Sequence, residues 1–143
     1  IMKSLICILL LFSSIGMAET LSKYEKESAK LQELRKQVRD QLKQSNEQVQ
    51  QNYQEAKELS LELLKIAAEE TPKIASLKEQ QKWAEAWQQF SKREGALRKS
   101  NKEFNRIWEE RSAIYERQGK LLRELSPEFK AQSKLVWELK QAQ

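Results

Sequence analysis

Histidine is absent from the 143-residue sequence, cysteine occurs once, and glycine and proline occur three times and twice. Without histidine, and with its one cysteine (Cys7) inside an apolar run, the chain cannot build a Ser-His or Cys-His nucleophile pair or an ordinary zinc site. Di-metal carboxylate bundles need Glu-x-x-His motifs, and phosphate-binding loops need clustered glycines. These absences predict a protein that is not an enzyme and that has no cofactor and no metal.

Residues 1–18 differ from the rest of the chain and have the order of an export signal. Lys3 precedes the apolar run LICILLLF, and the small residues Gly16 and Ala18 follow it. The apolar region around this run spans roughly 10 residues, within the range of signal peptides and short of the ~20 that span a bilayer. We therefore expect cleavage between Ala18 and Glu19, a periplasmic or secreted protein, and no transmembrane helix in the mature chain.

Other interpretations of the N-terminal segment are a buried helix of a cytosolic protein, an uncleaved signal anchor and a lipoprotein signal. A lipid-carrying cysteine follows small residues, whereas Cys7 follows Leu5 and Ile6 inside the apolar run. Cleavage after Ala18 would remove the one cysteine and both methionines, so the mature chain would form no disulfide.

The remaining sequence has the composition of a helical protein. Good helix formers dominate, namely Ala, Glu, Lys, Leu, Gln and Arg, whereas Val, Ile and Thr are sparse and never alternate with polar residues. The whole chain has 26 Lys and Arg against 21 acids, a net charge of +5, and removal of Lys3 with the signal leaves 25 against 21, about +4, on a surface of mixed sign. This excess favours an acidic protein or the anionic envelope surface as partner, and it is too small and too interleaved to indicate nucleic acid.

Apolar residues repeat with heptad spacing through a first helix, expected at about residues 20–70, and the frame runs from Leu21 to Ile66. Such a seam must be buried against another helix. Four polar residues interrupt it and can fix register or partner choice. These residues are Ser28, Arg35, Ser45 and Asn52.

Two Pro-containing signals divide the chain further. Thr71 and Ser126 each suit an N-cap position, and each precedes a proline, which the first position of a helix accepts. They predict helices at about residues 72–125 and 127–142. The apolar seam of the first of these is largely aromatic and also has heptad spacing. Its polar positions are Glu94, Asn101, Arg111 and Gln118.

These elements predict an all-α fold, a long antiparallel helical hairpin resembling a coiled coil with a short third helix, forming one domain over residues 19–143. A bend near Gly95, close to the polar stretch 98–102, would instead give a more compact bundle of three or four helices. The sequence leaves both arrangements open.

Tryptophan and arginine most often anchor interfaces, and both are concentrated between residues 83 and 111. The alternative is that the aromatic residues, at heptad spacing, belong to the core and that the cations form a solvated face. Two tryptophans one helical turn apart exceed what a two-helix core usually buries, so one is expected to face a partner. The candidate partner interface consists of Trp83, Trp87, Phe90, Arg93, Glu94 and Trp108.

Several of these residues resemble the LprI-type lysozyme inhibitor family of small exported helical domains. The similar positions are an Asn-to-Tyr segment at 46–53 and a second helix with Leu77-Lys78, Gln80 or Gln81, Trp87, Phe90, Arg93 and Glu94. Gly95 stands where the family has a cysteine. The resemblance implies an exported helical fold and lysozyme binding, whereas the basic surface is the opposite of what a basic lysozyme would attract.

The sequence therefore favours an exported, non-enzymatic helical binding protein, and the resemblance implies one similar to a lysozyme inhibitor. The alternative is a self-assembling coiled coil with a structural role in the envelope or a chaperone-like role, comparable in physical type to Skp-like chaperones.

Overall fold

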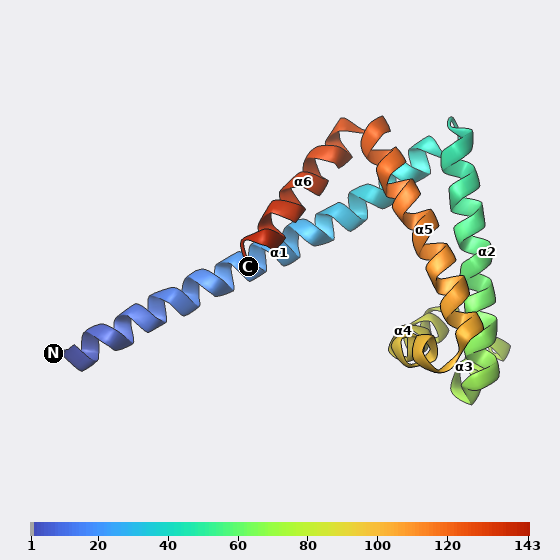
Figure 1. Cartoon of the computed structure of the whole chain (residues 1–143), viewed down its shortest axis with the longest axis horizontal. Coiled ribbons are helices and arrows are strands. Elements are labelled where there is room, and N and C mark those ends of the chain that lie inside the picture. The colour runs from blue at the N-terminus through green and yellow to red at the C-terminus, as the bar shows by residue number, and fades with distance from the viewer. Residues whose placement is uncertain (1) are drawn as a thin grey trace. The chain divides into compact units, whose positions relative to one another are not determined.

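The computed structural model describes the backbone of residues 2–143 and the side chains of residues 22–143 (Figure 1). The expected signal peptide over residues 1–18, with its cut between Ala18 and Glu19, lies outside the described side chains and stays a prediction. All regular structure in the described chain is helical, which confirms the all-α prediction. The helices are α1 (Met2–Leu42), α2 (Glu47–Glu70), α3 (Pro72–Glu79), α4 (Trp83–Ser100), α5 (Lys102–Leu125) and α6 (Pro127–Gln141).

Both Pro-containing signals mark helix starts. Ser126 is the N-cap of α6, where its side chain accepts a hydrogen bond from the Phe129 backbone N–H. Thr71 is the N-cap of α3 by position, but its hydroxyl makes no capping bond and is buried without a partner in the described chain. The start of α3 therefore depends on Pro72 at the first position rather than on the threonine side chain.

The sequence predicts three helices, but the described chain has six, because three further breaks interrupt the first two of the predicted helices. The first expected helix is interrupted at residues 43–46, and Asn46 caps α2 by accepting from the Val49 N–H at 3.0 Å. Asparagine offers the oxygen that an exposed N–H at a helix start requires.

The second expected helix is interrupted twice, and neither break is at Gly95, through which α4 runs continuously. Gln81, with φ of 56°, turns the chain between α3 and α4 in the left-handed region that glycine usually fills. Asn101 ends α4 and begins α5, where its side chain accepts from the Phe104 N–H at 3.0 Å. A break does occur within the polar stretch 98–102, and an asparagine cap causes it.

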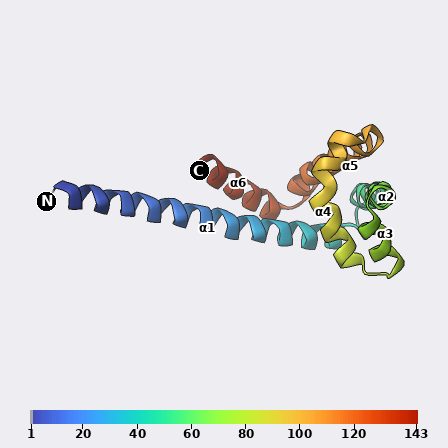
Figure 2. The ribbon, with the colours of Figure 1, turned by 90° about the horizontal axis from the view of Figure 1, so that it is seen from below.

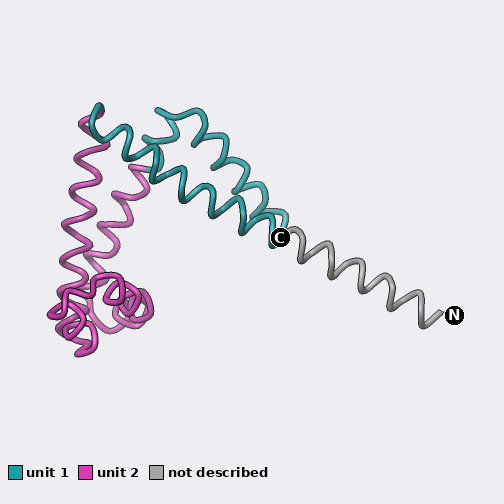
Figure 3. Tube along the Cα trace, turned by 180° about the vertical axis from the view of Figure 1, so that it is seen from behind, with its two compact units in different colours: residues 1–45, 119–143 teal, residues 46–118 magenta. Residues whose placement is uncertain are grey.

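The chain divides into two compact units, shown in Figure 3. Unit 1 comprises residues 1–45 and 119–143, and unit 2 comprises residues 46–118. The expectation of one domain over residues 19–143 stays a prediction.

Unit 2 has a continuous apolar core to which all of its helices contribute. Phe90 and Phe104 lie at its centre, with their ring centroids 5.8 Å apart. Trp87 and Trp108 are half-buried and pack against the same cluster. The other buried members come from α2, α3, α4 and α5, and they are Leu63, Leu64, Ala67, Ile74, Leu97 and Ile107. Burial of this many large side chains is the main stabilising contribution in the unit.

A buried polar pair fixes the register of α2 against α5. The Asn52 side chain donates to the Gln118 side-chain oxygen at 2.9 Å, and the Gln118 amide donates to the Val49 carbonyl at 3.1 Å. Farther along the same pair of helices, Arg111 donates to Ser60. Residue numbers rise on one helix as they fall on the other, so α2 and α5 run antiparallel within unit 2.

Unit 1 is thinner, because α6 packs along α1 with only the last residues of α5 beside them (Figure 2). Its buried apolar side chains are few, namely Val38, Leu122, Phe129 and Val136, and of these only Leu122 is fully buried. One polar contact joins the two helices: the Gln132 amide donates to both the backbone carbonyl and the carboxylate of Glu27, at 3.0 and 2.8 Å.

Candidate interaction surface

The six predicted interface residues all lie in unit 2, on α4 and α5, but they differ in exposure. Trp83 is 48% exposed at the start of α4, and Arg93 is also exposed. Trp87 and Trp108 each turn one side to the core. Phe90 is only 3% exposed and belongs to the core, which corrects its assignment to the partner interface.

The difference follows from the geometry of α4. Trp83, Trp87 and Phe90 follow one another at spacings of four and three, so they lie on one face of the helix. Phe90 stands in the middle of the helix over the core, and Trp87 meets it edge to face with centroids 5.2 Å apart. Trp83 is in the first turn and is the most exposed of the three, so its indole is the most accessible.

Glu94 is not free to meet a partner, because it is held by two side chains from α5. The Trp108 indole N–H donates to Glu94 Oε1, and Arg111 Nη2 donates to the same oxygen at 3.3 Å. The Arg111 side chain is only 12% exposed, so solvent screens this ion pair less than it screens a surface pair. Glu94 therefore ties α4 to α5.

Arg111 extends this cluster to α2. Its Nη1 donates to Ser60 Oγ at 3.1 Å, and its guanidinium carbon lies 5.4 Å from the centre of the Tyr115 ring. Its Nε is buried and has no hydrogen-bond partner in the described chain. The Glu94–Arg111 cluster, defined here as Ser60, Glu94, Trp108, Arg111 and Tyr115, joins three helices of unit 2.

Arg98 covers the outer side of Trp108. Its guanidinium carbon lies 3.4 Å from the centre of the indole ring, and its Nε donates to Asn105 Oδ1 at 3.3 Å. Stacking of a guanidinium on tryptophan is favourable because the ring face is electronegative. Trp108 is thus held between the core and Arg98, which leaves Trp83, the outer part of Trp87 and Arg93 as the accessible part of the predicted surface.

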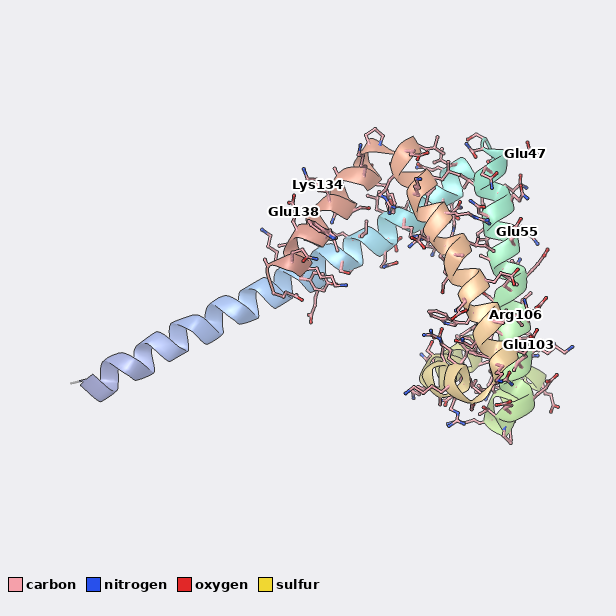
Figure 4. The ribbon with its side chains drawn as sticks, viewed as in Figure 1. Glu47, Glu55, Glu103, Arg106, Lys134 and Glu138 are labelled. Carbon is pink, nitrogen blue, oxygen red and sulfur yellow. The ribbon has the colours of Figure 1, made fainter. Side chains whose placement is uncertain are left out.

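Other charged groups on unit 2 form local surface pairs. Arg106 donates to Glu103 at 2.7 Å and to Glu110 at 3.1 Å (Figure 4). The hydrogen bond from Arg106 lowers the pKa of Glu103, and the same carboxylate raises the pKa of Arg106. These side chains are well exposed, so the pairs add little stability.

Among the residues described in full, no group of three or more acidic side chains is arranged to hold a metal ion. In the same part of the chain, no helix is both long enough and apolar enough to cross a membrane. The polar clusters of unit 2 connect helices to one another.

The sequence pattern does not predict the contacts of Ser60 and Tyr115 with Arg111 or the pairing of Glu94 with Arg111. The heptad frame did contain a signal, because Glu94 and Arg111 both occupy seam positions of opposite charge. The spacing alone does not show that a break at Asn101 brings them together.

The chain matches no protein-family model, no curated protein and no solved structure, so the resemblance to the LprI-type family stays a prediction.

Proposed function

We propose that this chain is an exported, non-catalytic helical binding protein that contacts a protein partner through the exposed part of α4. The observation that carries the proposal is the position of Trp83, which is 48% exposed and one helical turn from a tryptophan anchored on the core. A large rigid side chain in this position loses little entropy when it binds, and tryptophan is among the residues that dominate interface energies.

The polar groups of unit 2 support a binding role over a catalytic one. The Glu94 carboxylate is engaged by Trp108 and Arg111, and the Ser60 hydroxyl accepts a hydrogen bond from Arg111. A catalytic acid or nucleophile must instead be positioned toward substrate and activated by a neighbouring base. These residues are used to join helices, and they hold the α4 surface in place.

The test compares two exposed tryptophans, Trp83 in unit 2 and Trp137 in unit 1. Full-length wild type, Trp83→Ala and Trp137→Ala are immobilised separately and exposed to an envelope extract from the source cell. We expect a partner protein that is retained by wild type and Trp137→Ala and is lost with Trp83→Ala. Equal retention by all three, with unchanged circular dichroism, would remove α4 from the interface.

Export is tested independently of the partner. The full chain is expressed in its source cell, the cell is fractionated, and the N-terminus of the envelope form is sequenced. The proposal expects a mature chain beginning at Glu19 in the periplasmic or secreted fraction. A product that keeps residues 1–18 in the cytoplasm would contradict it.

The thin packing of unit 1 favours one second candidate, a self-assembling coiled coil. Leu31, Leu34 and Leu139 stay partly exposed although α1 and α6 pack together, so a further helix could cover them. Sedimentation velocity of the full chain over a range of concentrations decides the matter. Concentration-dependent growth that Leu31→Gln abolishes supports assembly, and a monomer at high micromolar concentration excludes it.

Lysozyme is the specific partner that the resemblance suggests. Excess full-length protein is added to a lysozyme turbidity assay with Trp83→Ala as the comparison. Protection by wild type that Trp83→Ala loses would identify lysozyme as the partner, and the absence of protection would exclude it and leave the partner to be found.

A further inference from the structure

Trp137 of α6 is the most exposed large apolar side chain in the described chain, at 62%. Phe129 and Val136 of the same helix are buried, so they define the inner face of α6. Since each residue advances a helix by 100°, Lys130, Lys134 and Trp137 lie on the outer face. We call Lys130, Lys134 and Trp137 the α6 stripe.

The lysines of the α6 stripe are available to an anionic surface. Lys130 is exposed and forms no ion pair in the described chain. Lys134 is 78% exposed and lies 3.9 Å from the Glu138 carboxylate, a distance typical of a weak surface pair. Figure 4 shows both side chains on the side of α6 turned away from α1.

The net charge of the protein lies in unit 1. Residues 46–118, which form unit 2, contain 13 Lys and Arg and 13 Asp and Glu, so that unit is neutral. The rest of the chain contains 13 basic residues and 8 acidic ones, which is the whole excess of +5. A partner attracted by charge is therefore attracted to unit 1, and the α6 stripe adds an exposed indole to that attraction.

We propose that the α6 stripe docks on the surface of an anionic phospholipid bilayer. An indole settles in the headgroup region of a bilayer, with its apolar body inward and its N–H in water, and flanking lysines reach the phosphates. The α6 helix has lysines and no arginine. Lysine supplies mobile point charges suited to a fluid array of phosphates, whereas arginine supplies the rigid fork that selects a single carboxylate on a protein.

This docking places α6 flat on the bilayer, with Phe129 and Val136 still packed within unit 1. It differs from membrane insertion, because only one face of α6 enters the headgroup layer. It also differs from the protein contact proposed for α4, since the two surfaces belong to different units and can be removed separately.

The test measures co-sedimentation of the full chain with vesicles of equimolar phosphatidylglycerol and phosphatidylcholine, and with vesicles of phosphatidylcholine alone. The neutral vesicles report what the apolar N-terminal residues contribute by themselves. We expect stronger binding to the anionic vesicles and a steep loss of that difference at high salt.

The decisive variant is Lys130→Gln/Lys134→Gln, and its control is Lys92→Gln/Lys99→Gln, which removes the same charge from exposed lysines of unit 2. Each lysine near an anionic surface strengthens binding about fivefold, so the first variant should bind roughly 25-fold more weakly. The control should bind as wild type does. An equal loss of affinity in both variants would show that binding depends on net charge alone. Unchanged affinity in both would show that α6 is not involved. Either result would overturn the proposal.

The aromatic part is tested with Trp137→Ala against Trp83→Ala. We expect several-fold weaker binding to anionic vesicles for the first and no change for the second. If polyglutamate binds wild type more tightly than the anionic vesicles do, and Trp137→Ala weakens only that binding, the partner is an acidic protein and the bilayer proposal fails. Circular dichroism confirms that each exposed substitution leaves the helices intact.

Discussion

The two units differ in how they are stabilised and in the charge they carry. Unit 2 is neutral and has a core drawn from four helices, with Phe104 and Leu63 completely buried. Unit 1 carries the excess of positive charge, and few of its side chains are fully buried. The larger core and the excess of positive charge therefore lie in different parts of one chain. Mutations in unit 2 should mainly change stability, and mutations in unit 1 should mainly change charge-dependent binding.

The largest expected effect is the loss of a core ring in unit 2. Phe104→Ala should lower the free energy of unfolding by about 3–5 kcal/mol, because it removes a completely buried side chain and leaves a cavity. Val136→Ala in unit 1 should cost about 1–2 kcal/mol, since it removes two methyl groups from a less complete core. Urea unfolding of both variants measures the difference. An equal cost would contradict the view that unit 2 is the better packed.

The next largest effect on stability is expected from the buried Asn52–Gln118 pair of unit 2. Asn52→Ala leaves the Gln118 oxygen without its donor and should destabilise the protein by about 1–3 kcal/mol. Gln51→Ala removes an exposed bond to Glu55 on the same helix and should change stability by less than about 0.5 kcal/mol. A cost for Asn52→Ala no larger than that control would mean that the pair does not hold α2 against α5.

Helix caps give a smaller and more selective effect. Ser126→Ala should cost about 1 kcal/mol, because it removes the bond to the Phe129 N–H at the start of α6. Thr71→Ala should cost less, since the Thr71 hydroxyl makes no capping bond and has no partner in the described chain. Thermal unfolding of the two variants ranks them, and the reverse order would show that Thr71 is the working cap.

The smallest effect is the pH dependence of stability that arises at Glu27 in unit 1. The Gln132 amide, and then Lys30, hold the pKa of Glu27 below its ordinary value of 4.5. A carboxylate with a lowered pKa in the folded state stabilises the fold above its unfolded pKa, and that contribution disappears as pH falls through the folded value. Wild type should therefore lose a small stability increment below about pH 4.5, and Glu27→Gln should not. Urea unfolding from pH 6 to pH 3 measures it, with the exposed Glu25→Gln as control; equal acid sensitivity in wild type and Glu27→Gln would contradict it.

The sequence predicts the class of fold because its residues agree on it locally. Strong helix formers, sparse β-branched residues and the two signals at Thr71 and Ser126 all favour helices that start where the structure starts them. The polar seam positions also point to real contacts, since Asn52 meets Gln118 and Glu94 meets Arg111.

The remaining breaks could not be predicted, because local preference there is weak or misleading. Gln81 adopts a left-handed backbone conformation that glutamine rarely takes, and the turn is closed by backbone hydrogen bonds from the Gln81 N–H to the Lys78 carbonyl and from the Lys82 N–H to the Leu77 carbonyl.

Asn46 and Asn101 are good caps, but the heptad frame continues past both of them. Asn46 follows the seam residue Ser45, and Asn101 is itself a polar seam position, so neither marks a break in the sequence pattern. Phe90 lies at a seam position with heptad spacing, and this spacing does not show whether an aromatic side chain faces the core or a partner.

Hydrogen exchange of the full chain, with and without vesicles of equimolar phosphatidylglycerol and phosphatidylcholine, tests the central claim most directly: unit 2 is the stable body and unit 1 meets an anionic surface. Without vesicles, amides of α2 should exchange more slowly than those of α6, since buried and well-packed helices open least. With vesicles, added protection should appear in Pro127–Gln141 and leave Glu47–Glu70 and Trp83–Ser100 unchanged. Protection that appears on α4 instead, or α6 amides as slow as those of α2 in the free protein, would contradict the account.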